Sequence, residues 1–280
     1  MAETITIGNV TIDVILDLTP PPREPEAFFP EVPIEEWEPY KREHLDANGK
    51  FQLNYCAAVI RSPESTVLVD TGLGPGPFER FGGMRGHLME RIRELGISPE
   101  DISTVVTTHF HGDHVGWNIT EEGGRKMATF PRARYLAPKA DWDYFTRPEI
   151  LQSQPVVQES VLPLQALGVL ELIEGGHAVT PEITTISTPG HTPGHLAIEV
   201  RSQGQKAMIV GDVFHNSVQV TEPDWHPSPD IDKELASRSR SDMLDRIERE
   251  GHLVFAWHIP RAMGIGKVVR TGGRRVWQAA

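Results

Sequence analysis

The chain has 280 residues, of which 39% are hydrophobic and 24% charged, values typical of a soluble globular protein that forms one multilayer domain or two small ones. Its formal net charge of -12 argues against a nucleic-acid partner, because binding a phosphate backbone requires a basic surface. The first residues lack a basic segment followed by an apolar one, and no apolar run is long enough to cross a membrane. We therefore predict a cytoplasmic protein without a membrane partner.

The first 50 residues divide into two parts. Residues 4–18 alternate between apolar and polar side chains, which predicts two strands joined by a turn at Gly8 and Asn9. Residues 19–50 are rich in proline and glutamate but also carry several aromatic residues, which are uncommon in disordered tails. We predict an ordered arm or lid over the domain. The alternative is an arm that contacts a second subunit, which would make the protein a homodimer.

The remaining sequence predicts strands in both halves, each half with its own helices. Expected strands are 51–60, 66–69, 104–108, 133–136, 169–173, 183–187, 197–200, 207–210 and a final one at 252–256. Expected helices are 84–95, ended by Gly96, several short pieces within 138–168, and a long amphipathic helix at 232–250. This pattern favours two sheets packed face to face with helices outside, in a single domain spanning 1–280.

Three histidines and an aspartate lie within the six positions that follow the strand at 104–108. They are His109, His111, Asp113 and His114. Imidazole and carboxylate groups are the ligands preferred by Zn²⁺ and similar divalent metals. In a tight loop His109 and His111 point to one side, while Asp113 and His114 reach a second point. One metal rarely takes four ligands so close in sequence, so the spacing favours two metals. The alternative is a polar loop with hydrogen-bonded histidines.

Motifs of the same kind recur along the chain and resemble those of the metallo-β-lactamase superfamily. The H-x-H-x-D-H signature stands at 109–114, a T-P-G-H-T-P-G-H segment at 188–195, a Gly-Asp pair at 211–212 and a Trp-His pair at 257–258. They follow one another in the family's order from residue 51 onward. The resemblance implies an α+β fold, the αβ/βα four-layer sandwich with two mixed β-sheets and helices outside.

The resemblance also implies a dinuclear metal site. The first metal would be held by His109, His111 and His191, the second by Asp113, His114 and His258, and Asp212 would bridge them. It further implies that Asp70 and His195 orient and support these ligands, although Asp70 could equally be a turn-forming aspartate. The two divalent ions are expected to be Zn²⁺, with Mn, Co or Fe as alternatives.

The implied reaction is a metal-dependent hydrolysis. Two metals sharing a water molecule would hold a hydroxide that attacks a lactone or ester carbonyl, and phosphotriesters are further candidate substrates. Asp113 would be the catalytic residue that moves the proton to the leaving group. Redox members of the superfamily tend to carry glutamate at the position of His111, so an oxidase is not expected.

The substrate is less well defined by sequence. Acyl-homoserine lactonases commonly have a tyrosine three residues after the bridging aspartate, whereas this chain has His215, which we predict to be a catalytic group that faces the substrate or supports the ligands. Residues 258–266 look more like the methyl parathion hydrolase branch. An apolar cleft is expected, lined by some of the aromatic residues Phe28, Phe29, Phe110, Trp117, Phe214 and Trp225, each of which could instead be core.

Three alternative functions remain on the same fold. A hydroxyacylglutathione-type thioesterase would need a basic pocket, for which Arg261, Lys267 and Arg270 are candidates. A β-lactamase would usually be exported, which the predicted lack of a signal sequence disfavours. A non-enzymatic metal-binding protein is the least favoured, because such members typically lose ligands.

Overall fold

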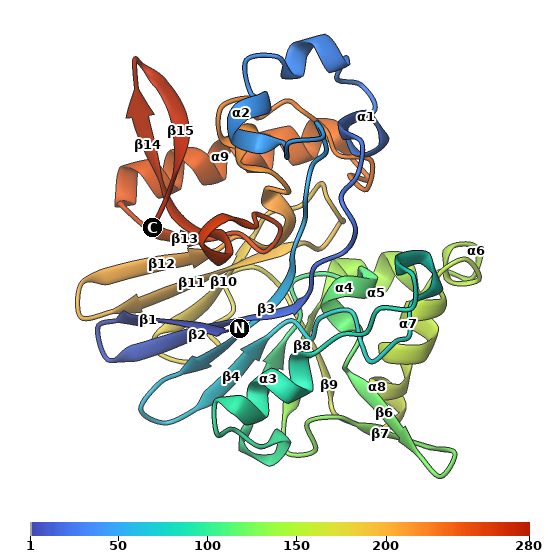
Figure 1. Ribbon diagram of the computed structural model, residues 1–280. Helices are drawn as coiled ribbons and strands as arrows, with labels where there is room; N and C mark the ends of the chain where they lie inside the picture. The colour runs from blue at the N-terminus through green and yellow to red at the C-terminus, as the bar shows by residue number, and fades with distance from the viewer. Residues whose placement is uncertain (1) are drawn as a thin grey trace.

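The computed structural model describes residues 2–280. Two mixed β-sheets face each other, and helices cover their outer faces (Figure 1). The first sheet has the strand order β1-β2-β3-β4-β5-β8-β9, and the second runs β10-β11-β12-β13-β14-β15. Strands β4, β5, β8 and β9 pair in parallel, as do β12 and β13, while the other neighbours are antiparallel. The predicted fold class is confirmed.

The strands of the first sheet are β1 (Ala2–Ile7), β2 (Val10–Leu18), β3 (Tyr55–Arg61), β4 (Thr66–Val69), β5 (Thr104–Val106), β8 (Arg134–Pro138) and β9 (Leu170–Ile173). Those of the second sheet are β10 (Ile183–Ser187), β11 (Leu196–Ser202), β12 (Gln205–Ile209), β13 (Leu253–Phe255), β14 (Ile265–Thr271) and β15 (Arg274–Ala279). A separate hairpin pairs β6 (Ile119–Glu122) with β7 (Arg125–Ala128).

The α-helices are α1 (Pro25–Phe28), α2 (Lys41–His44), α3 (Leu88–Glu94), α4 (Gly112–Val115), α5 (Lys139–Phe145), α6 (Pro148–Leu151), α7 (Pro155–Ser160), α8 (Leu162–Ala166) and α9 (Lys233–Glu250). Short 3₁₀ turns are η1 (Ile34–Trp37), η2 (Glu79–Phe81), η3 (Pro99–Asp101), η4 (Gly211–Val213), η5 (Ser217–Val220) and η6 (Arg261–Gly264). Within residues 2–280, the longest helix is too polar to cross a lipid bilayer.

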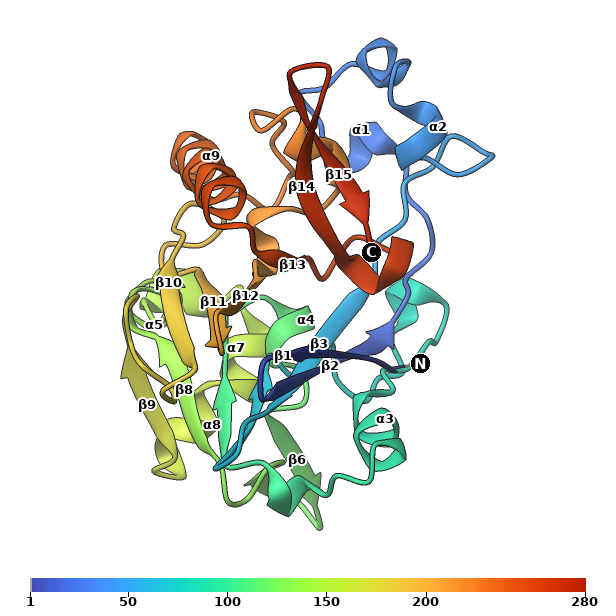
Figure 2. The same ribbon diagram turned by 90° about the vertical axis from the view of Figure 1, so that its left-hand side faces the viewer.

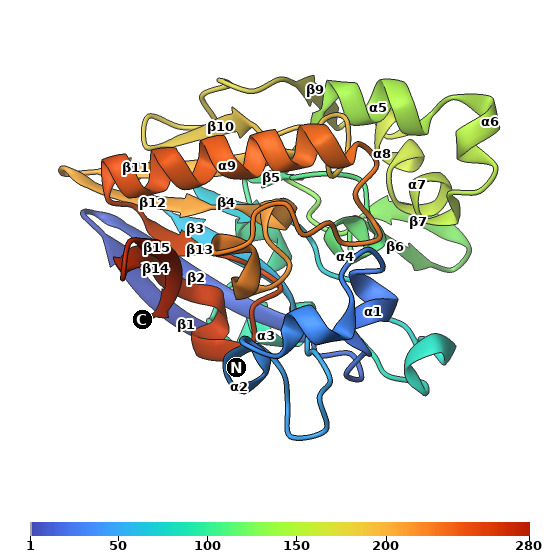
Figure 3. The same cartoon turned by 90° about the horizontal axis from the view of Figure 1, so that it is seen from above.

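Three apolar layers hold the sandwich together. Between the sheets, small and branched side chains such as Val14, Ile60 and Ile198 form a buried apolar core. Outside the first sheet, α3 and α8 bury their apolar faces. Outside the second sheet lies α9, which is seen along its whole length from above (Figure 3). These layers form because alternate strand residues face opposite sides of each sheet.

The boundaries of α9 follow from ordinary capping chemistry. The side chain of Asp232 accepts a hydrogen bond of 2.9 Å from the backbone N–H of Leu235. At the other end Gly251 takes a left-handed conformation with φ of 70°. The predicted helix at 232–250 is therefore confirmed.

Two strand pairs were not predicted from the sequence. The expectation that 252–256 is the final strand is wrong, because β14 and β15 follow and extend the second sheet as a projecting hairpin (Figure 2). The alternation of apolar and polar residues that would identify these strands is interrupted by Lys267, Arg270, Arg274 and Arg275. The β6–β7 hairpin also consists largely of polar and charged residues, so it lacks the alternating apolar pattern of a strand.

The helix expected at 84–95 is shorter than predicted. Met84 instead forms a β-bridge with Phe78, and the helix α3 begins at Leu88. The backbone N–H of Leu88 donates to the buried carboxylate of Asp17, at 2.8 Å. A contact from a distant strand therefore sets the start of this helix, which local sequence periodicity does not reveal.

The arm at residues 19–50 is ordered and packs against residues 217–226 (Figure 1). Its anchor is Trp37, which has no exposed surface and whose ring centroid lies 4.8 Å from that of Trp225. The surrounding cluster contains Phe28, Phe29, Val32, Phe51, Leu53 and Val218. Polar contacts add to it: His44 Nδ1 lies 2.8 Å from Ser217 Oγ, and Tyr40 hydrogen bonds to Glu222.

Because Trp37 fills the centre of this cluster, we expect Trp37→Ala to lower the free energy of unfolding by about 3–5 kcal/mol. Chemical denaturation followed by circular dichroism measures this loss. Exposed Glu36 provides the control, since Glu36→Ala should change stability by less than about 0.5 kcal/mol. Equal stability of the Trp37→Ala variant and the wild type would show that the arm is not anchored in this way.

Candidate metal centre

The candidate ligands come from loops that follow strands of both sheets. His109, His111, Asp113 and His114 follow β5, and Asp70 follows β4 of the same sheet. From the second sheet, His191 lies in the β10–β11 loop, Asp212 in η4 after β12, and His258 after β13. The two sheets thus deliver the predicted residues to one shared end of the sandwich.

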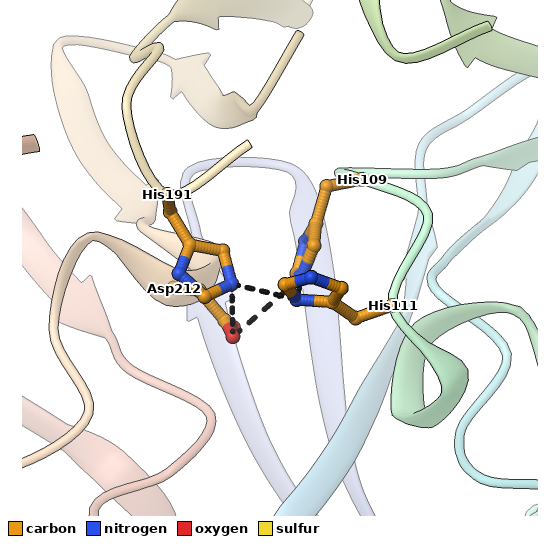
Figure 4. A group of neighbouring side chains, drawn as sticks. All are labelled: His109, His111, His191 and Asp212. Atoms are coloured by element: carbon orange, nitrogen blue, oxygen red, sulfur yellow. Dashed lines mark hydrogen bonds and ion pairs between the residues drawn. The ribbon is translucent and has the colours of Figure 1, made fainter. Parts of the chain in front are cut away.

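Three imidazole nitrogens converge in the first donor group (Figure 4). His111 Nδ1 lies 3.2 Å from His109 Nε2 and 2.9 Å from His191 Nε2. Asp212 Oδ2 is 3.2 Å from His191 Nε2 and 3.6 Å from His109 Nε2. These four side chains reach one point from three separate loops.

The second donor group is formed by Asp113, His114 and His258. Asp113 Oδ2 lies 3.6 Å from His114 Nε2 and 3.8 Å from His258 Nε2. Asp212 Oδ1 completes this group, at 3.2 Å from His114 Nε2 and 3.1 Å from His258 Nε2. Asp212 Oδ2, which faces the first group, also lies 3.1 Å from His258 Nε2, so the carboxylate stands between the two donor groups and contacts both.

The chemistry of these donors fits two divalent cations. Imidazole nitrogens and carboxylate oxygens are the ligands of Zn²⁺ and related metals, and neighbouring lone pairs at these distances repel unless a cation or proton lies between them. His114 Nε2 is buried and has no hydrogen-bond partner within residues 2–280. Burial disfavours the charged form of the His191 ring, but Asp212 and Asp230 outweigh it and raise its pKa to about 9. The same negative potential favours metal binding.

The outward-facing nitrogens of the ligand histidines are held by the protein. Asp70 accepts hydrogen bonds from His114 Nδ1 at 2.8 Å and from Thr108 Oγ1 at 2.8 Å. The Thr108 hydroxyl in turn accepts from His109 Nδ1 at 3.0 Å, and His258 Nδ1 donates to the backbone carbonyl of Asn54 at 2.8 Å. Each of these contacts fixes the tautomer and leaves Nε2 free to bind a metal.

His195 lies beneath the site and uses both nitrogens within the protein. Its Nε2 accepts the backbone N–H of Asp212 at 2.9 Å, and its Nδ1 lies 2.7 Å from Thr188 Oγ1. Burial holds the pKa of His195 well below its ordinary value, so the ring is neutral and can accept at Nε2. Both ring nitrogens of His195 therefore contact groups of the protein.

Asp230 and Arg240 are functional candidates that sequence reasoning missed. The buried carboxylate of Asp230 accepts a hydrogen bond of 2.8 Å from His191 Nδ1. Its other oxygen accepts from Arg240 at 3.2 Å, and Arg240 also donates to the carbonyl of Val213 at 2.7 Å. Arg240 is a charged residue on the apolar face of the predicted helix, in register with Ala236 and Leu244. This pattern was the sequence signal that could have identified it.

Asp141 was also missed. Its buried carboxylate accepts the N–H of Phe110 at 3.0 Å, the hydroxyl of Thr192 at 2.9 Å and the N–H of Gly194 at 2.6 Å. These bonds tie the 109–114 loop to the 188–195 loop. Burial raises the pKa of Asp141 to about 6 in spite of these hydrogen bonds. Its position within a short helix offered no sequence signal for this role.

His215 lies against the donor groups rather than in the cleft. Its Nε2 is 3.0 Å from Asp212 Oδ2, and its ring stacks on His258 with centroids 5.0 Å apart and planes 8° apart. Phe28 of the arm packs on the other side, with centroids 5.4 Å apart. The side chain is buried, so the structure places His215 beside Asp212 and not at the cleft surface.

A cleft of about 710 Å³ leads to His111 and Asp113. Its walls come from the arm residue Arg23, from Tyr55 of β3, from the loop at 73–80 and from residues 154–160 at α7. The predicted aromatic lining is wrong, since none of the six proposed residues lines this cleft. Phe28, Phe29 and Trp225 fill the arm cluster, while Phe110, Trp117 and Phe214 pack in or against other apolar clusters.

The basic residues considered for a glutathione pocket lie elsewhere. Arg270 on β14 pairs with Glu248 of α9, and Lys267 is on the same strand. Arg261 lies in η6 and borders a different cavity, beside the arm. None of the three lines the cleft that leads to His111 and Asp113.

Comparison with known proteins agrees with this geometry. Residues 56–258 match the sequence model of the Metallo-beta-lactamase superfamily. The chain belongs to this superfamily. The match covers most of the chain and includes all seven candidate ligands.

Proteins similar in sequence to this chain include N-acyl homoserine lactonases. One from Bacillus sp is 25% identical over 222 residues, covering 71% of this chain and 79% of the relative. The N-acyl homoserine lactonase AiiB of Agrobacterium fabrum is 42% identical over 191 residues, covering 60% of this chain and 65% of the relative.

Solved structures resemble the whole chain. Hydrolase AbOPH of the β-lactamase superfamily aligns with a TM-score of 0.86 and 25% identity, covering 100% of this chain and 97% of the other. AidC, a dizinc quorum-quenching lactonase solved with a homoserine product, aligns with a TM-score of 0.83 and 21% identity over the same shares. At that identity the second likeness supports the fold alone.

We expect Asp230→Ala to weaken metal binding by about 10- to 100-fold, because the carboxylate that orients His191 is lost. Titration with a competing chelator dye measures this affinity. Asp242 is exposed on α9, so Asp242→Ala is the matched control and should bind metal as the wild type does. Unchanged affinity in the Asp230→Ala variant would mean that this hydrogen bond does not support the metal centre.

Proposed function

We propose that this protein is a dinuclear zinc hydrolase that opens lactone rings, with N-acyl homoserine lactones as the first substrates to test. The observation that carries the proposal is the position of Asp212, whose two oxygens face two groups of histidines at the end of a cleft. The names of the curated relatives support the choice of lactones among carbonyl substrates.

In this proposal His109, His111 and His191 hold the first metal, and Asp113, His114 and His258 hold the second. Asp212 binds both. Asp70 and Asp230 fix the rings of His114 and His191, and His195 fixes the backbone of Asp212. All seven proposed ligands are present in the chain, which weighs against a non-enzymatic metal-binding protein.

When bound, two divalent metals lower the pKa of a shared water molecule and polarise the substrate carbonyl. Asp113 is the proposed proton carrier because its side chain reaches the cleft and is 19% exposed. Burial opposes ionisation of Asp113, but the charges of His114 and His258 hold its pKa below the ordinary value. It is thus a carboxylate at neutral pH, able to accept a proton and return it to the leaving alkoxide.

His215 is proposed as a positioning residue. Its Nε2–H can donate to Asp212 Oδ2, at 3.0 Å, and so hold the carboxylate in its shared orientation. The buried ring cannot reach a substrate in the cleft without moving Phe28 or His258. Of the two roles predicted from the sequence for His215, facing the substrate or supporting the ligands, this geometry favours the support of a ligand.

Ester and phosphotriester hydrolysis are secondary proposals, since the same two-metal chemistry serves both. A thioesterase acting on glutathione conjugates is less well supported, because its expected basic residues lie outside the cleft. The cytoplasmic location, the single hydrolase domain and the homodimer stay predictions from the sequence.

The proposed function is tested with protein reconstituted with Zn²⁺, and separately with Mn²⁺ or Co²⁺. Substrates are acyl-homoserine lactones, simple lactones, aryl esters, a phosphotriester, a glutathione thioester and a β-lactam. We expect lactones to be hydrolysed fastest and chelation to abolish the activity. Asp212→Ala should lose activity and metal content while staying folded, with Asp242→Ala as control. Full activity in the Asp212→Ala variant would refute the dinuclear mechanism.

For His215 we expect His215→Phe to lower kcat by about 10- to 100-fold, because Asp212 loses a hydrogen bond. KM should stay within about threefold, and His215→Gln, whose amide can still donate, should recover much of the rate. Steady-state kinetics and metal analysis measure these effects. A rise in KM alone would indicate direct substrate contact, and loss of one metal per chain would indicate that His215 is a ligand.

A further inference from the structure

One wall of the cleft carries two arginines that have no acidic partner. Arg23 comes from the arm just before α1, and Arg80 comes from η2. Within residues 2–280 neither guanidinium has a carboxylate oxygen closer than 4.0 Å. The chain has a net charge of -12, so acidic partners are plentiful elsewhere on the protein. Two guanidinium groups without an acidic partner thus border the same cleft.

Both arginines are held in place by aromatic rings. The guanidinium carbon of Arg23 lies 5.6 Å from the ring centroid of Phe28, which belongs to the buried arm cluster. That of Arg80 lies 4.7 Å from the ring centroid of Phe81. Cation–π contacts of this kind favour the observed side-chain positions without neutralising the charge. The two groups are thus positioned in advance for an anion.

Tyr55 lies between these arginines and the metal centre. Its hydroxyl accepts a hydrogen bond of 2.9 Å from Arg23, which leaves its own proton available. The ring contacts Phe81, with centroids 6.2 Å apart, and His258, with centroids 5.8 Å apart. The Tyr55 hydroxyl can therefore donate to a group bound in the cleft.

The part of the cleft lining contributed by residues 154–160 has a different character. It contains Gln154, Pro155, Val156, Glu159 and Ser160 at α7. Glu159 is exposed, and Asp113 at the metal centre is the other acidic residue in the lining. An anionic substrate group would be repelled by Glu159 and attracted to the wall formed by Arg23, Tyr55 and Arg80. A neutral acyl chain would gain nothing from two charged donors.

We propose that Arg23, Tyr55 and Arg80 bind a carboxylate group of the substrate, so that the preferred substrates are lactones or esters carrying a second, anionic group. This inference rests on the proposed hydrolase function and specifies its substrate class. The reacting carbonyl lies at the metal centre, and the carboxylate lies against the arginine wall. Guanidinium groups suit this role because they form charge-assisted, often bidentate, hydrogen bonds with carboxylates.

The test compares two acyl-homoserine lactones with acyl chains of equal length, one ending in a methyl group and one in a carboxylate. With the zinc-loaded wild type we expect kcat/KM to be about 10-fold or more higher for the carboxylate substrate, mainly through a lower KM, the effect of one charge-assisted contact. The double variant Arg23→Met/Arg80→Met should lose this preference, so that its kcat/KM for the carboxylate substrate falls to about its own value for the methyl-ended substrate. Added salt should reduce the preference.

Exposed Arg125 on β7 lies outside the cleft, so Arg125→Met is the matched control and should keep the preference. Arg80→Lys should keep part of it, since the charge remains. If the double variant does not fold, the single variant Arg80→Met decides, because Arg80 is exposed and is expected to contribute little to stability.

The outcomes separate this inference from the proposed function. Hydrolysis of both substrates without a preference for the carboxylate would overturn the inference and leave the lactonase in place. Hydrolysis of neither would overturn the lactonase. In that case calorimetric titration of the zinc-loaded protein with adipate tests the wall directly. If adipate binds the double variant at least about 10-fold more weakly than the wild type, the proposed carboxylate site is supported. Equal binding of adipate by both proteins refutes it.

Discussion

The carboxylate of Asp212 shared between two groups of imidazoles is the interaction on which the rest of the site depends. Its geometry requires a fixed backbone, because a small rotation would turn both oxygens toward one group. His195 supplies part of that restraint by accepting the N–H of Asp212. Gly211 supplies another part: its φ is 54°, and a Cβ there would lie 2.7 Å from His195 Nε2. Glycine is thus required for His195 to approach so closely.

Buried carboxylates connect the ligand loops to the two sheets. Asp70 binds Thr108, His114 and Trp257, so it joins the ends of β4, β5 and β13. Asp141 joins the two histidine-bearing loops. Within residues 2–280, neither Asp70 nor Asp141 has an arginine partner, and both accept hydrogen bonds from N–H and O–H donors. Burying a carboxylate is unfavourable unless several hydrogen-bond donors converge on it. The resulting hydrogen bonds restrict how the loops can move.

The sequence was sufficient to predict the fold class and to place the candidate ligands, because their spacing reflects strand ends and tight loops that are local. His109 and His111 are two residues apart, and Asp212 lies in the short turn η4 after β12. Asp230 and Arg240 could not be predicted with confidence from local pattern, since their partners are 39 and 27 residues away. The cleft was predicted poorly for a related reason: aromatic residues of the arm looked suited to bind substrate, but they are needed to attach the arm.

The arm delivers Arg23 to the cleft and Phe28 to the side of His215, yet it supplies none of the proposed metal ligands. The residues proposed to select substrates are therefore separate in sequence from the proposed metal ligands. Substitutions at Arg23 and in the loop at 73–80 would alter the lining of the cleft without removing a proposed metal ligand. A protein organised in this way can acquire a new substrate range through changes in two short segments while its hydrolytic chemistry is retained.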